Sequence, residues 1–85
     1  MSPTLNRLIL DIVERQIRGN DPPETRQTFN RLRKEGYSEQ EAKNLIGTVV
    51  VCEMYDTLKE ERPFDQARFA SALENLPELP FEDDE

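Results

Sequence analysis

Ser38-Glu39-Gln40-Glu41 has the sequence of a helix capping box, and no proline follows it until Pro63. In such a box the serine side chain caps the glutamate N–H, and the glutamate side chain returns the contact. Acids in the first turn also suit the helix dipole. The pattern therefore predicts a long helix over residues 39–61, although the β-branched run Thr48–Val51 taken alone would suit a strand.

The predicted helix 39–61 is apolar on two sides when its residues are placed at 100° steps. One side carries Ala42, Leu45, Ile46 and Val49. The opposite side carries Val51, Met54, Tyr55 and Leu58. A helix that is apolar on two faces is covered on two sides. We therefore expect this helix to be central, with its second face against either the last helix or another chain.

Two helices are predicted before it, over residues 3–18 and 22–35. Leucine, isoleucine and valine recur at three- and four-residue spacing in the first, which gives one apolar stripe. We expect Gly19 to end that helix in the left-handed conformation. Asp21 is expected to cap the second helix, with proline at its first position and Glu24 completing a capping box. Its apolar face is thin, so we expect it to be the most weakly held helix.

A last helix is predicted over residues 66–76. Asp65 is its expected cap, and Phe64 is placed to pack against Phe69 as a hydrophobic staple. Pro77 stops it, and residues 77–85 carry five acids and two prolines, which predicts a disordered acidic tail. Leu79 and Phe81 in this tail could also dock on a groove.

The fold class is therefore all-α: a small four-helix, bundle-like single domain over residues 1–76 with a disordered tail at 77–85. A chain of 85 residues has room for only one modest core. The expected core is Leu5, Leu8, Ile9, Ile12, Phe29, Leu32, Ala42, Leu45, Ile46, Val49, Phe69 and Leu73.

Composition excludes several classes of site. The chain has no histidine, which removes most zinc sites and the commonest general base. Its one cysteine, Cys52, excludes an internal disulfide framework and suits a reducing compartment. No apolar stretch approaches the ~20 residues of a membrane span, and the first residues lack the pattern of a cleaved signal. We expect a cytoplasmic protein without a cofactor.

The charge is unevenly divided along the chain. The net charge of −7 is the sum of +2 over residues 1–37 and −9 over residues 38–85. Basic residues gather in the predicted helix 22–35, at Arg26, Arg31, Arg33 and Lys34. That helix, the turn after it and the next helix have a helix-turn-helix outline, so nucleic-acid binding through Arg26 and Arg33 is one alternative. An acidic chain is a poor candidate for it, because phosphate neutralisation supplies most of such affinity.

Three carboxylates form a second alternative. Glu53, Asp56 and Glu60 continue the Ala42–Val49 side of the helix at helical spacing. Hard divalent cations take oxygen ligands of this kind, so the three are candidate metal ligands; a solvated helix end is the competing interpretation. Cys52 has no histidine to activate it and is expected to be a structural thiol.

Asn20–Arg26, Arg31-Leu32, Glu35–Ser38 and Glu41-Ala42 together resemble a group of small bacterial helical proteins with a Pro-Pro-Glu helix start. In that group a glycine turn leads into a long helix that begins with Glu-Ala. The resemblance covers residues 5–76. Many such proteins carry a His-Glu-Ala-x-His run, typical of a zinc-binding helix, where this chain has Gln40-Glu41-Ala42-Lys43-Asn44. The resemblance implies a bacterial cytoplasmic helical domain and no particular activity.

We therefore expect a non-enzymatic module that binds a protein or associates with itself, with a protein partner or a homodimer and no membrane partner. The candidate interaction residues are Val51, Met54, Tyr55, Leu58, Arg26 and Arg33.

Overall fold

The computed structural model describes residues 3–20 and 22–79, with side chains from Arg7 onward. This part of the chain forms four α-helices and confirms the all-α class. They are α1 (Pro3–Gly19), α2 (Pro23–Lys34), α3 (Glu39–Glu60) and α4 (Gln66–Asn75).

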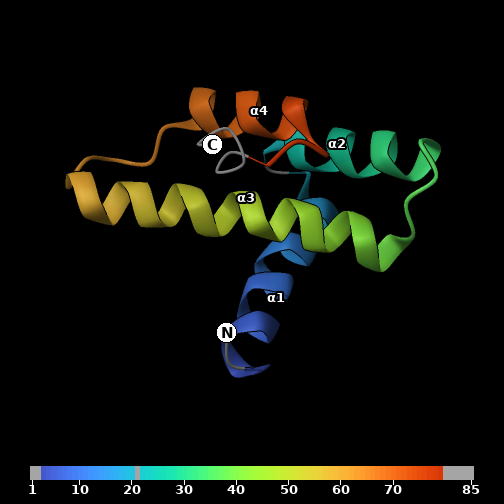
Figure 1. Cartoon of the computed structure of the whole chain (residues 1–85), viewed down its shortest axis with the longest axis horizontal. Coiled ribbons are helices and arrows are strands. Elements are labelled where there is room, and N and C mark those ends of the chain that lie inside the picture. Colours follow the sequence, from blue (N-terminus) through green and yellow to red (C-terminus); the bar gives the residue numbers. More distant parts are fainter. Residues whose placement is uncertain (1–2, 21, 80–85) are drawn as a thin grey trace.

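Helix α3 is the central element, as predicted. Figure 1 shows it along the length of the molecule, with α2 and α4 on one side and α1 crossing it at a steep angle. α3 packs against each of the other three helices. α2 does so as well, which differs from the expectation of a weakly held helix.

Polar side chains hold α2 where its apolar face is thin. Thr25 is fully buried, and its hydroxyl donates to Gln16 Oε1 of α1 at 2.8 Å. On the other side of α2, Arg31 Nη2 donates to the carbonyl oxygen of Leu73 at 3.1 Å. That carbonyl lies in the last turn of α4 and also accepts from the Leu76 N–H at 3.1 Å, so Arg31 supplies its second hydrogen bond. A prediction based on the pattern of apolar residues misses such polar contacts, and so underestimated how firmly α2 is held.

The predicted helix signals at α3 and α4 are confirmed. Ser38 Oγ accepts from the Glu41 N–H at 3.1 Å, and Glu41 Oε1 accepts from the Ser38 N–H at 2.8 Å, which completes the capping box. Asp65 Oδ1 accepts from two N–H groups in the first turn of α4. The rings of Phe64 and Phe69 lie 5.5 Å apart, as expected of a hydrophobic staple.

The predicted signals between α1 and α2 are partly wrong. Gly19 is the last residue of α1, and the left-handed residue is Asn20, with φ 55°. Asparagine tolerates that conformation because its short side chain can bond locally. The cap residue of α2 is Pro22, which offers no capping side chain, so Glu24 completes no capping box. The predicted cap, Asp21, lies outside the described residues.

The core lies where all four helices meet. Seven of the predicted core residues are buried, namely Ile9, Leu32, Ala42, Ile46, Val49, Phe69 and Leu73. Three are half-buried and pack against that core: Ile12, Phe29 and Leu45. Leu8 is a wrong prediction, because it is 56% exposed. The side chain of Leu5 lies outside the described part of the chain. Buried residues that were not predicted are Val13, Thr25, Thr28, Gly47, Val50, Glu53 and Leu76.

The C-terminal segment stays in contact with the core beyond α4. Leu76 is buried, and Leu79 is half-buried and packs against the core. The contact reaches three residues past the predicted domain end at residue 76. Residues 80–85, including Phe81, lie outside the described residues.

Candidate interaction surface

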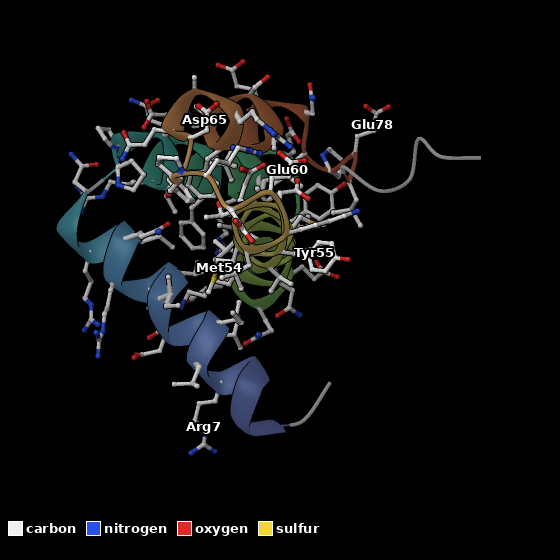
Figure 2. All side chains as sticks on the ribbon, turned by 90° about the vertical axis from the view of Figure 1, so that its left-hand side faces the viewer. Arg7, Met54, Tyr55, Glu60, Asp65 and Glu78 are labelled. Atoms are coloured by element: carbon white, nitrogen blue, oxygen red, sulfur yellow. The ribbon has the colours of Figure 1, made fainter. Side chains whose placement is uncertain are left out.

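The second apolar side of α3, which we call the outer face, consists of Val51, Met54, Tyr55 and Leu58. Val51 is half-buried. Met54, Tyr55 and Leu58 are 43%, 62% and 77% exposed. Figure 2 shows Met54 on the side of α3 nearer α1 and Tyr55 on the side away from α1. Three large apolar side chains thus lie uncovered within five consecutive residues.

Helix α4 does not cover the outer face. Arg68 of α4 pairs with Asp56 at 2.9 Å and approaches Glu53 Oε2 at 3.9 Å, so α4 packs against the carboxylate-bearing side of α3. The outer face was predicted to pack against either the last helix or another chain. Within this chain the last helix does not pack against it.

Helix α1 covers only the beginning of the same side of α3. A Cβ added at Gly47 would lie 3.1 Å from Ile9 Cγ2 and 3.9 Å from Val13 Cγ2. The helices thus cross closely at Gly47, where the missing side chain lets the backbones approach. Met54 and Leu58 lie two and three turns further along this side of α3, beyond the crossing.

The N-terminal part of α1 projects past α3. In Figure 1 it extends away from the other three helices, and in Figure 2 Arg7 lies near its far end. Leu8 on this projecting part has no helix to pack against, which explains its exposure. The apolar stripe of α1 predicts which face of the helix is buried. It does not predict how far along α1 the neighbouring helix covers that face.

Lys59 borders the outer face. Its Nζ lies 5.9 Å from the centre of the Tyr55 ring, within the range of a cation–π contact. This contact leaves the Tyr55 ring 62% exposed. The face thus has an apolar centre and a charged edge, the usual composition of a protein–protein contact surface.

The predicted metal ligands are paired with arginines. Asp56 pairs with Arg68, and Glu60 accepts from Arg62 Nε at 2.6 Å. The hydrogen bond from Arg62 lowers the pKa of Glu60. Within residues 3–20 and 22–79 no group of three acidic, cysteine or histidine side chains is placed to hold a metal ion. The structure therefore does not bring Glu53, Asp56 and Glu60 together as ligands.

Glu53 is the unusual member of this group, because its side chain is only 7% exposed. Its position four residues after the buried Val49 was a signal for burial. Glu53 Oε1, Thr57 Oγ1 and Arg62 Nη2 are buried without a hydrogen-bond partner among the described residues. Buried polar atoms of this kind cost stability, so the junction of α3 and α4 contributes less stability than a fully paired contact would.

Cys52 is half-buried on α3. Burial raises the pKa of its thiol, and the nearby carboxylates of Asp56 and Glu53 raise it further. Because the thiolate is the reactive form, this environment makes Cys52 a poor nucleophile and agrees with a structural thiol.

The basic residues of α2 have separate roles. Arg31 bonds the end of α4 and pairs with Glu35 at 2.9 Å. Arg33 Nη1 donates to the carbonyl oxygen of Tyr37 at 3.1 Å, while Arg26 and Lys34 are exposed. In the following helix, Lys43 Nζ contacts Glu39 at 2.9 Å and Glu14 at 3.2 Å. The carboxylate pairs make Arg31 and Lys43 less available for phosphates, whereas Arg26 and Arg33 stay exposed on α2.

An open hollow of about 280 Å³ lies where α1, α2 and α3 meet. Ile17 and Phe29 give it apolar walls, while Glu14, Glu39 and Lys43 close one side through their ion pairs. These three charged groups therefore bond one another, while the exposed Arg18 lines the hollow beside them.

No helix in the described part of the chain is long and apolar enough to cross a membrane. A scan against protein-family models, a search of curated proteins and a search of solved structures found no match to this chain. The resemblance to small bacterial helical proteins therefore stays a prediction.

Proposed function

We propose that this protein is a non-enzymatic interaction module that binds a protein, or a second copy of itself, through the outer face of α3. The observation that carries this proposal is the exposure of Met54, Tyr55 and Leu58 side by side on a central helix. Single exposed apolar residues are ordinary. A contiguous group of them, with charged residues at its edge, is typical of a contact surface.

The energetics favour a covered state of this face. Burying apolar surface contributes about 25 cal/mol per Å², and tyrosine and methionine are enriched at the centres of interfaces. The face also lies on a two-turn segment within the 22-residue helix α3, so its backbone is already ordered when a partner binds.

The test is capture of binding partners by the purified, tagged full chain, compared with the Tyr55→Glu variant. The matched control is Ser71→Glu, which adds the same charge at an exposed position on α4. We expect wild type and Ser71→Glu to capture a protein partner or to self-associate. Tyr55→Glu is expected to do neither. A nuclease-treated sample is included, since partners lost on that treatment would point to Arg26 and Arg33 instead.

The proposal is wrong if Tyr55→Glu retains both self-association and every protein that wild type captures. Far-ultraviolet circular dichroism and the melting temperature confirm that each variant is folded. Because Tyr55 is 62% exposed, the substitution leaves the core unchanged.

A further inference from the structure

We propose that the occupant of the outer face is the projecting N-terminal part of α1 from a second copy of this chain, in a two-fold dimer where each copy receives the other's α1. This inference rests on the proposed function and names its partner.

The first argument is continuity with a contact already present in the molecule. Within one chain, Ile9 and Val13 of α1 cover α3 at Gly47. Met54 and Leu58 continue the same side of α3 but are 43% and 77% exposed. An apolar helix like α1, set further along α3, would extend the existing packing over them.

The second argument is the matching exposed surface on α1 itself. Leu8 is 56% exposed on the part of α1 that projects from the body (Figure 1). The pairing of Glu14 with Lys43 holds the next turns of α1 against the N-terminal half of α3. Leu8 lies about 120° around α1 from Glu14, so neither this ion pair nor the contact of Ile9 with α3 covers it.

The third argument is charge. Helix α1 carries three arginines and two acids, for +1, whereas the segment 53–62 carries four acids and two basic residues, for −2. The C-terminal end of α3 adds the partial negative charge of the helix dipole. Arg7, exposed near the far end of α1 (Figure 2), can therefore approach the end of α3 of a second copy, where four acids outnumber Lys59 and Arg62.

The fourth argument is area. The exposed parts of Leu8, Met54, Tyr55 and Leu58 amount to roughly 400–500 Å² per copy, against about 800 Å² per partner in a standard interface. Since about 56–65% of an interface is apolar, this supplies the apolar centre of one. In a two-fold dimer the contact between α1 of one copy and the outer face of the other occurs twice. The dimer therefore gains the free energy of two such contacts.

The test uses two charge variants of exposed residues, Leu8→Lys and Leu58→Glu, with Gln27→Lys on the exposed side of α2 as control. Sedimentation equilibrium of the full chain is measured at protein concentrations from the low micromolar to the submillimolar range. Wild type and Gln27→Lys are expected to reach twice the chain mass of 9.9 kDa. Each Leu variant alone is expected to weaken dimerisation at least about tenfold, because two charges would face apolar side chains.

An equimolar mixture of the two variants distinguishes this arrangement from others. In a mixed dimer one contact pairs the side chain introduced by L8K with the one introduced by L58E, and the other contact is wild type. The mixture is therefore expected to recover dimerisation to within a few-fold of wild type. A dimer built from α3 against α3 would be weakened by Leu58→Glu, unaffected by Leu8→Lys and not restored by mixing, and that result would overturn the proposal.

A wild-type chain that stays monomeric over the whole concentration range would overturn the proposal as well. If Tyr55→Glu then still abolished capture of another protein, the proposed function would stand with a different partner. If Tyr55→Glu abolished neither self-association nor capture of a protein, the proposed function and the dimer proposal would both be wrong.

Discussion

Arg68 should stabilise the fold through the two carboxylates that it faces on α3, and Arg68→Met tests this. Its Nη2 lies 2.9 Å from Asp56 and its Nε lies 3.9 Å from Glu53. Methionine keeps most of the side-chain volume but removes the charge. Asp56 and Glu53 would then repel each other across one helical turn, and the buried Glu53 would lose a counterion.

The magnitude follows from the exposure of the three groups. Removing one partner of a buried ion pair costs about 3–5 kcal/mol, whereas an exposed pair contributes about 0–1 kcal/mol. Glu53 is 7% exposed, but Arg68 is 46% exposed and its contact with Glu53 is long. We therefore expect a loss of about 1–2 kcal/mol in the free energy of unfolding. In a domain of this size that corresponds to a decrease of roughly 4–16 °C in Tm.

The assay is thermal and urea unfolding followed by circular dichroism, with Arg15→Met as the matched control. Arg15 pairs with Asp11 at 3.2 Å, but both side chains are exposed, at 72% and 46%. The control is expected to change the free energy by less than about 0.5 kcal/mol. If Arg68→Met lowers Tm no more than Arg15→Met does, the argued role of the buried Glu53 is refuted.

Three further predictions concern local contacts. Ser38→Ala removes the capping box of α3, so urea unfolding should show a loss of about 1 kcal/mol; no change would contradict the role of the cap. Lys43→Met tests the pair with Glu39, whose pKa is lowered chiefly by its hydrogen bond from Lys43. A lowered carboxyl pKa stabilises the fold above its unfolded value and not below its folded value, so the stability gap between wild type and variant should narrow as the pH falls from about 6 to 3. A constant gap would contradict this. Because burial raises the pKa of Cys52, its alkylation by iodoacetamide at about pH 8 should be slower in the folded chain than in urea, and equal rates would show an accessible thiolate.

Helix boundaries were predictable where side chains determine them. Ser38 and Asp65 bond backbone N–H groups within three residues along the chain, so their sequence context is sufficient. The start of α2 was not predicted as observed, because Pro22 occupies the cap position without a side-chain bond. Only the geometry of the preceding turn, with Asn20 in the left-handed region, shows where the chain enters α2.

The outer face was predictable as an apolar stripe but not as an exposed one. Helical spacing shows that Met54 and Leu58 share a side of α3, but it does not show where α1 crosses. That crossing depends on Gly47 and on contacts more than 30 residues apart in sequence. The exposure of Leu8 has the same origin, since a stripe does not reveal how far one helix extends beyond another.

The most direct test of the outer face is sedimentation equilibrium of the wild-type chain beside Leu58→Glu over the same concentration range. Leu58 is 77% exposed, so this substitution changes the surface and leaves the core intact. The account predicts a reversible monomer–dimer equilibrium for wild type and a monomer for the variant. Two identical curves at the monomer mass would contradict self-association through this face, and two identical curves at the dimer mass would place the interface elsewhere.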